Sequence, residues 1–366
     1  MRVLIRADTS DGVGTGHLVR CLALAGKLRD RGVSVTLACA PVLPYVSKMV
    51  SAAGCELIDL TSRSLTTKRR KAEQLLATAD QHEDAATARD AVLGASFEWV
   101  IVDHYGLDAR WEHEMRAGAR RILVIDDLTN RPHDCDLLVD QNPGVDRQAR
   151  HHALSGSALR CLVGPRYALL RPGFAAARAR IDARQGRVER ILVMHGGADP
   201  TGETIKAVKA LQRLPSLATH IDVVVGSANP QSHAVHALCS GDARMRFHFD
   251  AENVPELMAA ADLALGACGT STWERCCMYL PTIAVIVAEN QTEIAAGLAE
   301  AGVAEISGWH ADVTVERLAQ AVEHLVASPE RMRAMSMRAG ELTDGRGVDR
   351  VHEAMEEVDA HSRVLH

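Results

Sequence analysis

Aromatic residues are scarce in this chain of 366 residues, at 3% of the total, so its core must be built mostly from Ala, Val and Leu. Long apolar runs are missing as well, and none approaches the roughly 18 residues that span a membrane. The opening residues enter a polar loop too early for a signal peptide. We therefore expect neither membrane insertion nor export.

Cysteine motifs are also missing. The nine cysteines are scattered, with Cys276 and Cys277 adjacent, and no C-x-x-C pair occurs. The histidines show no spacing typical of a metal site. This pattern favours reduced thiols, and we expect a cytoplasmic protein that needs no metal and no cofactor.

Excess basic charge is absent too, since 47 acidic residues against 41 basic ones give a net charge of −6. Without a long basic run, a broad nucleic-acid surface is excluded, and an anionic ligand would need a local site. The length exceeds the roughly 250 to 300 residues at which single cores stop growing, so two domains are expected.

Short apolar runs alternate with helical stretches along the chain, which predicts parallel sheets covered by helices on both faces. An Ala- and Arg-rich stretch at 172–186 suggests the boundary between a domain at 1–172 and another at 187–345. A last helix in 346–366 could pack back across the domain boundary.

Residues 62–92 are interpreted as an exposed helix. Strands are expected at 3–7, 33–39, 55–60, 99–102, 122–125, 137–139, 190–194, 221–225, 245–249, 263–266 and 282–287.

A glycine loop at 11–17 joins the first strand to the first helix, where backbone N–H groups and the helix dipole favour an anion or a polarised oxygen. Dinucleotide binding is disfavoured because His17 stands where that motif needs glycine, and a P-loop is excluded. The helix dipole opposes protonation of His17, whose neutral imidazole could accept a proton from water. An equal alternative is that His17 only caps the turn.

Two loops in the second half suit phosphates. Gly196 and Gly197 follow a strand, and without side chains they allow the backbone to come close to a phosphate. The stretch 266–274 ends another strand with three hydroxyl residues, and Glu274 suits ribose hydroxyls. The simpler reading of the hydroxyl residues 270–272 is an ordinary helix N-cap.

Together these segments resemble the UDP-2,4-diacetamido-2,4,6-trideoxy-β-L-altropyranose hydrolases of pseudaminic acid biosynthesis, over nearly the whole chain. The resemblance implies the glycosyltransferase-B fold, in which two Rossmann-like α/β domains face each other across a cleft, and it implies no metal. The matching segments are GTGHLVRC at 14–21, IVDHYGLDARWE at 101–112, IDDLTNRPHDCDLLVDQNP at 125–143, GPRYALLRP at 164–172, HGGADPTG at 195–202, GTSTWERCC at 269–277 and AENQ at 288–291.

The resemblance also assigns residues: His17 matches the catalytic base, and Asp103 and Tyr105 match residues near the sugar. His195 and Cys268 depart from the family's usual aromatic and small residues. The other residues expected at the sugar and phosphates are Asp8, Gly14, Thr15, Gly16, Arg20 and His104. Those expected to bind UDP are Gly196, Gly197, Asp199, Gly269, Thr270, Ser271, Thr272, Glu274, Asn290 and Gln291.

The resulting hypothesis is hydrolysis of a UDP-sugar. Water would attack the anomeric carbon with inversion, His17 would take its proton, and helix N-termini near Gly197 and Thr270 would stabilise the leaving diphosphate. The only partner expected is the small-molecule substrate, bound by a monomer. A glycosyltransferase of the same fold and a non-catalytic UDP-sugar-binding protein are the alternatives.

Overall fold

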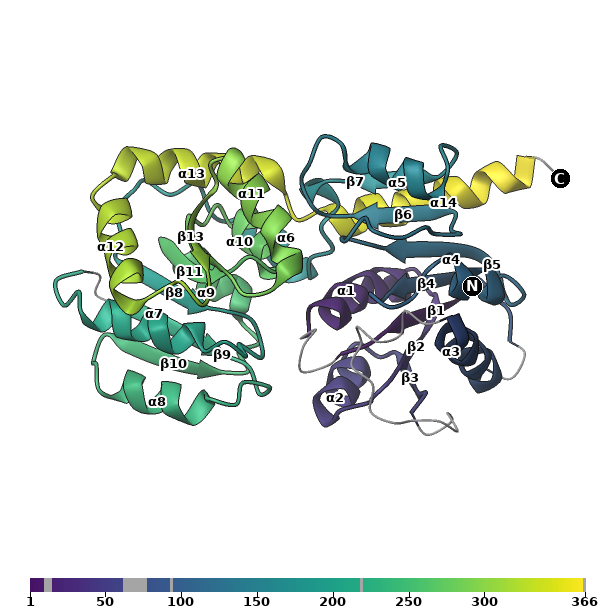
Figure 1. Ribbon diagram of the computed structural model, residues 1–366, viewed down its shortest axis with the longest axis horizontal. Helices are drawn as coiled ribbons and strands as arrows, with labels where there is room; N and C mark the ends of the chain where they lie inside the picture. The colour runs from purple at the N-terminus through teal and green to yellow at the C-terminus, as the bar shows by residue number, and fades with distance from the viewer. Residues whose placement is uncertain (10–14, 62–77, 93–94, 218–219, 365–366) are drawn as a thin grey trace. The chain divides into compact units, whose positions relative to one another are not determined.

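The computed structural model describes residues 1–9, 15–61, 78–92, 95–217 and 220–364. The chain forms two compact units (Figure 1). The first comprises Met1–Leu169 and Arg346–His366, and the second comprises Leu170–Gly345. The chain therefore enters the second unit once and returns to the first.

The first unit is built on a seven-stranded parallel sheet in the order β3-β2-β1-β4-β5-β6-β7. Its strands are β1 (Arg2–Ala7), β2 (Ser34–Cys39), β3 (Glu56–Asp59), β4 (Phe97–Asp103), β5 (Ala119–Ile125), β6 (Leu137–Asp140) and β7 (Arg160–Val163). Its helices are α1 (Gly16–Asp30), α2 (Pro44–Ala52), α3 (Thr78–Ala91), α4 (Ala109–Met115), α5 (Arg147–Ser155), the 3-10 turn η2 (Pro165–Tyr167) and α14 (Gly347–Val364).

Both faces of this sheet are buried. In β1, Val3 and Ile5 belong to one apolar cluster together with Leu24 of α1. Leu4, between them, belongs to another cluster together with Trp111 of α4. Because neighbouring residues of a strand point to opposite faces, a strand covered on both sides carries apolar residues in succession, as Val3 to Ile5 do.

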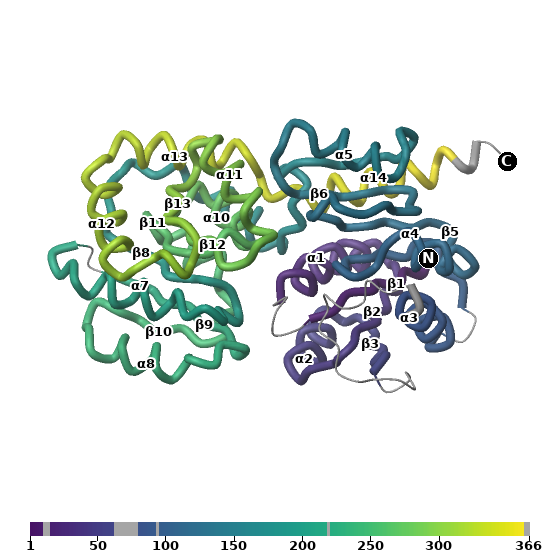
Figure 2. The backbone as a smooth tube through the Cα atoms, viewed as in Figure 1, coloured from purple at the N-terminus to yellow at the C-terminus, as the bar shows by residue number. Residues whose placement is uncertain are grey.

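The C-terminal helix α14 completes the first unit (Figure 2). Val351 and Met355 are buried in the same cluster as β1 and α1. Lys27 Nζ of α1 lies 2.5 Å from Asp349 Oδ1, and Trp99 Nε1 of β4 donates to Asp359 Oδ2 at 3.2 Å. Residues far apart in sequence therefore share one core.

The second unit is built on a six-stranded parallel sheet in the order β10-β9-β8-β11-β12-β13. Its strands are β8 (Arg190–Met194), β9 (His220–Val225), β10 (Met245–Phe249), β11 (Leu263–Ala267), β12 (Thr282–Ile286) and β13 (Ala304–Trp309). Its helices are α6 (Pro172–Arg178), α7 (Glu203–Gln212), α8 (Ser232–Ser240), α9 (Val254–Ala260), α10 (Ser271–Cys277), the 3-10 turn η3 (Glu289–Gln291), α11 (Thr292–Glu300), α12 (Val315–Val326) and α13 (Pro329–Leu342).

The predicted α/β class with two parallel-sheet units is confirmed, but three details of the prediction were wrong. The short strands β7 and β13 were missed; β13 carries polar Glu305 and Ser307, and its register with β12 shifts between Ala284 and Val285. Helix α3 is not simply exposed, because its alanines 85 and 88 are buried. Residues 62–77 of that predicted helix lie outside the described residues.

The strand order fixes where polar side chains gather. In the first unit the connections leave in opposite directions from β1 and β4, and in the second unit from β8 and β11. Ligands of such sheets bind at the carboxyl ends of the strands beside this switch point. Among the described helices, none combines the length and the apolar character needed to cross a membrane.

We expect Gly347→Ala to destabilise the first unit. A Cβ there would lie 2.1 Å from the backbone oxygen of Ala168, which cannot rotate away. Overpacking of this kind lowers the free energy of unfolding by about 1 to 3 kcal/mol. The matched control is Gly26→Ala in α1, where a Cβ meets nothing within 4 Å. Replacing a helical glycine should raise stability by about 0.5 to 1 kcal/mol. Thermal unfolding of both variants checks this, and shifts of the same sign would contradict it.

Candidate functional site

His17 lies in the first turn of α1 and is held by Asp103, the last residue of β4. The Nδ1 atom of His17 is 2.8 Å from Oδ1 of Asp103 and 3.2 Å from its backbone oxygen. A carboxylate can only accept, so Nδ1 carries the hydrogen and the lone pair lies on Nε2. That Nε2 atom is buried and has no hydrogen-bond partner among the described residues. The ring is therefore anchored to β4 and does not cap its own turn.

Asp103 is itself clamped by Arg20, one turn further along α1. Arg20 donates from Nε to Oδ2 at 2.6 Å and from Nη2 to Oδ1 at 2.7 Å. Burial alone would raise the pKa of Asp103, but Arg20 and then His17 hold that pKa well below its usual range. The carboxylate thus stays ionised and can orient the imidazole throughout the physiological pH range.

Tyr105 restrains the same imidazole from another direction. Its ring meets that of His17 edge to face, with 4.4 Å between centroids and 87° between the planes. Tyr105 follows β4 by two residues, as the D-x-Y spacing of the sequence requires. The structure therefore brings together four of the predicted sugar-site residues: His17, Arg20, Asp103 and Tyr105.

Asp8 and His104, also predicted at this site, bind mainly to protein atoms. His104 Nε2 lies 3.0 Å from Asp8 Oδ2, and His104 Nδ1 accepts from Gly106 N at 3.0 Å. The other oxygen of Asp8 accepts from Ala40 N at 2.7 Å, and Arg6 also binds this carboxylate. These contacts hold the loops after β1, β2 and β4 together. Contact of Asp8 or His104 with a ligand stays a prediction.

Three further predicted residues lie in the glycine loop. Thr15 and Gly16 are partly exposed where α1 begins, and the carbonyl of Thr15 accepts from Val19 N at 3.0 Å. Gly14 lies outside the described residues.

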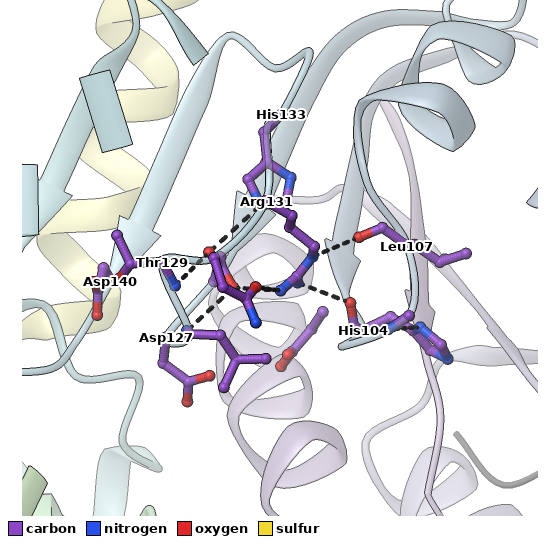
Figure 3. Close-up of polar contacts among 12 residues, drawn as sticks. His104, Leu107, Asp127, Thr129, Arg131, His133 and Asp140 are labelled. Carbon is purple, nitrogen blue, oxygen red and sulfur yellow. Dashed lines mark hydrogen bonds and ion pairs between the residues drawn. The ribbon is translucent and has the colours of Figure 1, made fainter. Parts of the chain in front are cut away.

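A second buried polar cluster, which the sequence did not reveal, fixes the segment after β5 (Figure 3). His133 lies between two carboxylates, with Nδ1 2.7 Å from Glu112 Oε1 and Nε2 3.4 Å from Asp126 Oδ2. Arg131 binds Asp126 Oδ1 at 3.0 Å and donates to the Leu107 carbonyl at 2.8 Å. Burial lowers the pKa of His133, but Glu112 and then Asp126 outweigh it and raise that pKa to about 9.

In the second unit, Asp199 binds the start of α7. Its Oδ1 accepts from Glu203 N at 3.0 Å and its Oδ2 from Thr204 N at 2.8 Å. Two first-turn N–H groups of α7 are therefore occupied by Asp199. Contact of this N-terminus or of Asp199 with a diphosphate stays a prediction. Gly196 and Gly197 precede it, and a Cβ on Gly226 would lie 2.6 Å from Gly197 O. The loops after β8 and β9 thus pack closely.

The hydroxyl residues after β11 surround a buried arginine. Arg275 donates from Nη1 to Ser271 Oγ at 3.0 Å and from Nη2 to Thr272 Oγ1 at 3.1 Å. It also donates to the Ala267 carbonyl at 2.6 Å. The phosphate contacts predicted for Ser271 and Thr272 stay predictions. Both hydroxyls already accept a hydrogen bond from Arg275. Gly269 and Thr270, at the same loop, are partly exposed.

Glu274 and the residues after β12 lie near this loop. Burial raises the pKa of Glu274, although Arg171, whose Nη2 lies 3.9 Å from Oε1, opposes it. Gln291 accepts from Val287 N at 3.1 Å, and its Nε2 would lie 3.5 Å from a Cβ on Gly269. Asn290 is exposed. The loops after β11 and β12 therefore lie side by side.

His195 directly follows β8 and is buried, and neither ring nitrogen has a partner within the described part of the chain. Burial is the main cause that lowers the pKa of His195 to about 4; Asp199 opposes it, and Arg275 and Lys206 add to it. The imidazole is thus neutral near pH 7. No group of three or more His, Cys, Asp or Glu side chains within the described residues is arranged to hold a metal ion.

The fold and the clustering of polar side chains at both switch points define a class, the glycosyltransferase-B fold. MurG of Acinetobacter baumannii shares this fold with a TM-score of 0.61 and 16% identity, over 97% of this chain and 99% of that one. UDP-GlcNAc 2-epimerase of Neisseria meningitidis shares it with a TM-score of 0.64 and 12% identity, over 98% and 100%.

Sequence comparison gives the particular relatives. The chain is 24% identical to the UDP-2,4-diacetamido-2,4,6-trideoxy-beta-L-altropyranose hydrolase of Campylobacter jejuni, over 82% of this chain and 97% of that protein. This match confirms the resemblance drawn from the motifs. The chain is also 29% identical to the spore coat polysaccharide biosynthesis protein SpsG of Bacillus subtilis, over 51% of this chain and only 56% of that protein. Residues 190–351 match the glycosyltransferase family 28 C-terminal domain.

The His133 cluster makes stability depend on pH. Because the pKa of His133 is raised from 6.5 to about 9 in the folded protein, its contribution is full below pH 6.5 and is lost as pH rises through 9. We expect the melting temperature to fall over that interval, with about 3 kcal/mol of stability lost. His133→Gln should be less stable at pH 7 and should lack this fall. Parallel pH profiles for the two proteins would contradict the assignment.

Proposed function

We propose that the protein hydrolyses a UDP-linked acylamino sugar of the 2,4-diacetamido-2,4,6-trideoxyaltrose type, releasing UDP and the free sugar. The observation that carries this proposal is the orientation of His17. Its Nδ1 is committed to an ionised carboxylate, and its Nε2 keeps a buried lone pair without a partner among the described residues. The substrate named for the Campylobacter relative supports the choice of sugar.

In this mechanism Nε2 of His17 takes a proton from water as the oxygen attacks the anomeric carbon. Asp103 accepts from Nδ1 before and after this transfer, so it stabilises the imidazolium without being protonated itself. Arg20 keeps Asp103 in place through two hydrogen bonds. The histidine therefore enters the reaction in the correct tautomer and orientation.

The second unit is proposed to hold the UDP. Family 28 similarity covers all of the predicted nucleotide residues, from Gly196 to Gln291. The glycine loop after β8 allows its backbone to come close to a phosphate. The loop after β11 surrounds the buried guanidinium of Arg275. The bond broken is the one between the anomeric carbon and the diphosphate oxygen, which departs with the electron pair.

The alternative is sugar transfer to a hydroxyl, favoured by the family 28 match. A non-catalytic UDP-sugar-binding protein is the third possibility. Incubating the protein with the UDP-sugar, first alone and then with a hydroxyl acceptor, separates all three. Hydrolysis predicts UDP and free sugar without any acceptor, transfer predicts turnover only after an acceptor is added, and a binding protein gives no products.

Oxygen-18 water tests the position of bond cleavage. Attack at the anomeric carbon should place the label in the free sugar, and mass spectrometry should find UDP unlabelled. Nuclear magnetic resonance of the first-formed sugar should show inversion. Label in UDP would mean attack at phosphorus and would contradict the proposed reaction.

Substitutions test the histidine. We expect His17→Asn to lower kcat by about a hundredfold or more, the usual contribution of a general base. Asp103→Asn should lower kcat by a comparable factor because an amide can stabilise the wrong tautomer. His113→Asn, on an exposed side chain of the same unit, is the control and should keep full activity. An unchanged kcat in His17→Asn would remove the base from the mechanism.

A further inference from the structure

Asp127, two residues beyond the end of β5, carries a buried oxygen that no group among the described residues satisfies. Its side chain is 10% exposed, and its Oδ2 accepts from Arg20 Nη1 at 2.9 Å. Its Oδ1 is buried and has no partner in the described part of the chain. Leaving a buried acceptor unsatisfied costs about 1 to 3 kcal/mol, so such an atom requires an explanation.

Asp127 is also held rigidly. Its backbone oxygen accepts from Arg147 Nη2 at 2.7 Å and from Asn142 Nδ2 at 3.1 Å. The preceding residue, Asp126, is fixed by the cluster of Arg131 and His133. Figure 3 shows the Asp127 carboxylate pointing away from that cluster, so the donors there do not reach it. The open oxygen is therefore presented in one direction.

Arg20 connects the Asp127 carboxylate, through its other oxygen Oδ2, to His17. The guanidinium binds Asp127 through Nη1 and Asp103 through Nε and Nη2, and Asp103 in turn binds His17. Among the described residues, the linked chain His17–Asp103–Arg20–Asp127 leaves Nε2 of His17 and Oδ1 of Asp127 without partners, and both are acceptors. A ligand that matches them must bring hydrogen-bond donors.

We propose that Asp127 is a sugar-recognition residue, whose Oδ1 accepts a hydrogen bond from an N–H or O–H group of the sugar. This inference rests on the proposed function and gives a role to a residue that lies in the matching segment 125–143 but was assigned none there. A buried carboxylate oxygen left unpaired penalises any sugar without a donor at that position, so the same contact selects the substrate.

Asp127→Asn is the sharpest test. Arg20 offers only donors, so the amide oxygen of Asn should face Arg20 and the NH2 group should replace Oδ1. A donor would then meet the donor of the sugar. In a His17→Asn background without turnover, we expect the Kd of the UDP-sugar to rise at least tenfold in calorimetric titrations, with the Kd of UDP unchanged. Asp146→Asn removes the same charge at an exposed side chain and should change neither constant.

Asp127→Glu is a second test variant, because it keeps the negative charge beside Arg20 and moves the oxygen that replaces Oδ1. It should weaken the UDP-sugar and leave UDP unaffected. An unchanged Kd of the UDP-sugar in both variants would overturn the inference while leaving the hydrolase proposal intact. Equal weakening of UDP would also overturn it, since the carboxylate would not act on the sugar. Failure of the unsubstituted site to bind any UDP-sugar would overturn both proposals.

Discussion

The proposed catalytic site of the first unit depends on the buried guanidinium of Arg20. It joins carboxylates from the ends of two neighbouring strands, Asp103 of β4 and Asp127 beyond β5, to helix α1. Removing one partner of such a buried pair costs about 3 to 5 kcal/mol, because an uncompensated charge remains. Two carboxylates and one guanidinium leave one net negative charge, which is cancelled when the neighbouring imidazole accepts a proton. The arrangement thus suits a base.

The second unit uses its buried cation differently. Arg275 is bound by a carbonyl and two hydroxyls, and no carboxylate lies within ion-pair distance of it among the described residues. In the proposed function, its positive charge would help to attract the diphosphate at the carboxyl ends of β8 and β11. His195, neutral and without partners in the described chain, lies at the same strand ends.

Much of this could be predicted from the sequence, because the evidence is local. Alternating apolar runs predicted the parallel sheets, and a glycine loop followed by a helix predicted where His17, the proposed base, would lie. Partnerships across the fold could not be predicted. Nothing in the spacing of residues 20, 103 and 127 reveals that one guanidinium joins the two acids. In the same way, Asp8 and His104 carry suitable groups for a ligand, yet only the folded chain shows that they bind each other.

The burial of the His17 Nε2 atom bears on which nucleophile it serves. The atom has essentially no exposed surface, and the ring is fixed by Asp103 on one side and Tyr105 on another. A base must come within about 3.2 Å of the oxygen whose proton it takes. Water reaches such an atom with less displacement of its surroundings than a hydroxyl carried by a sugar or a lipid. This burial supports the proposed hydrolysis over the alternative of transfer.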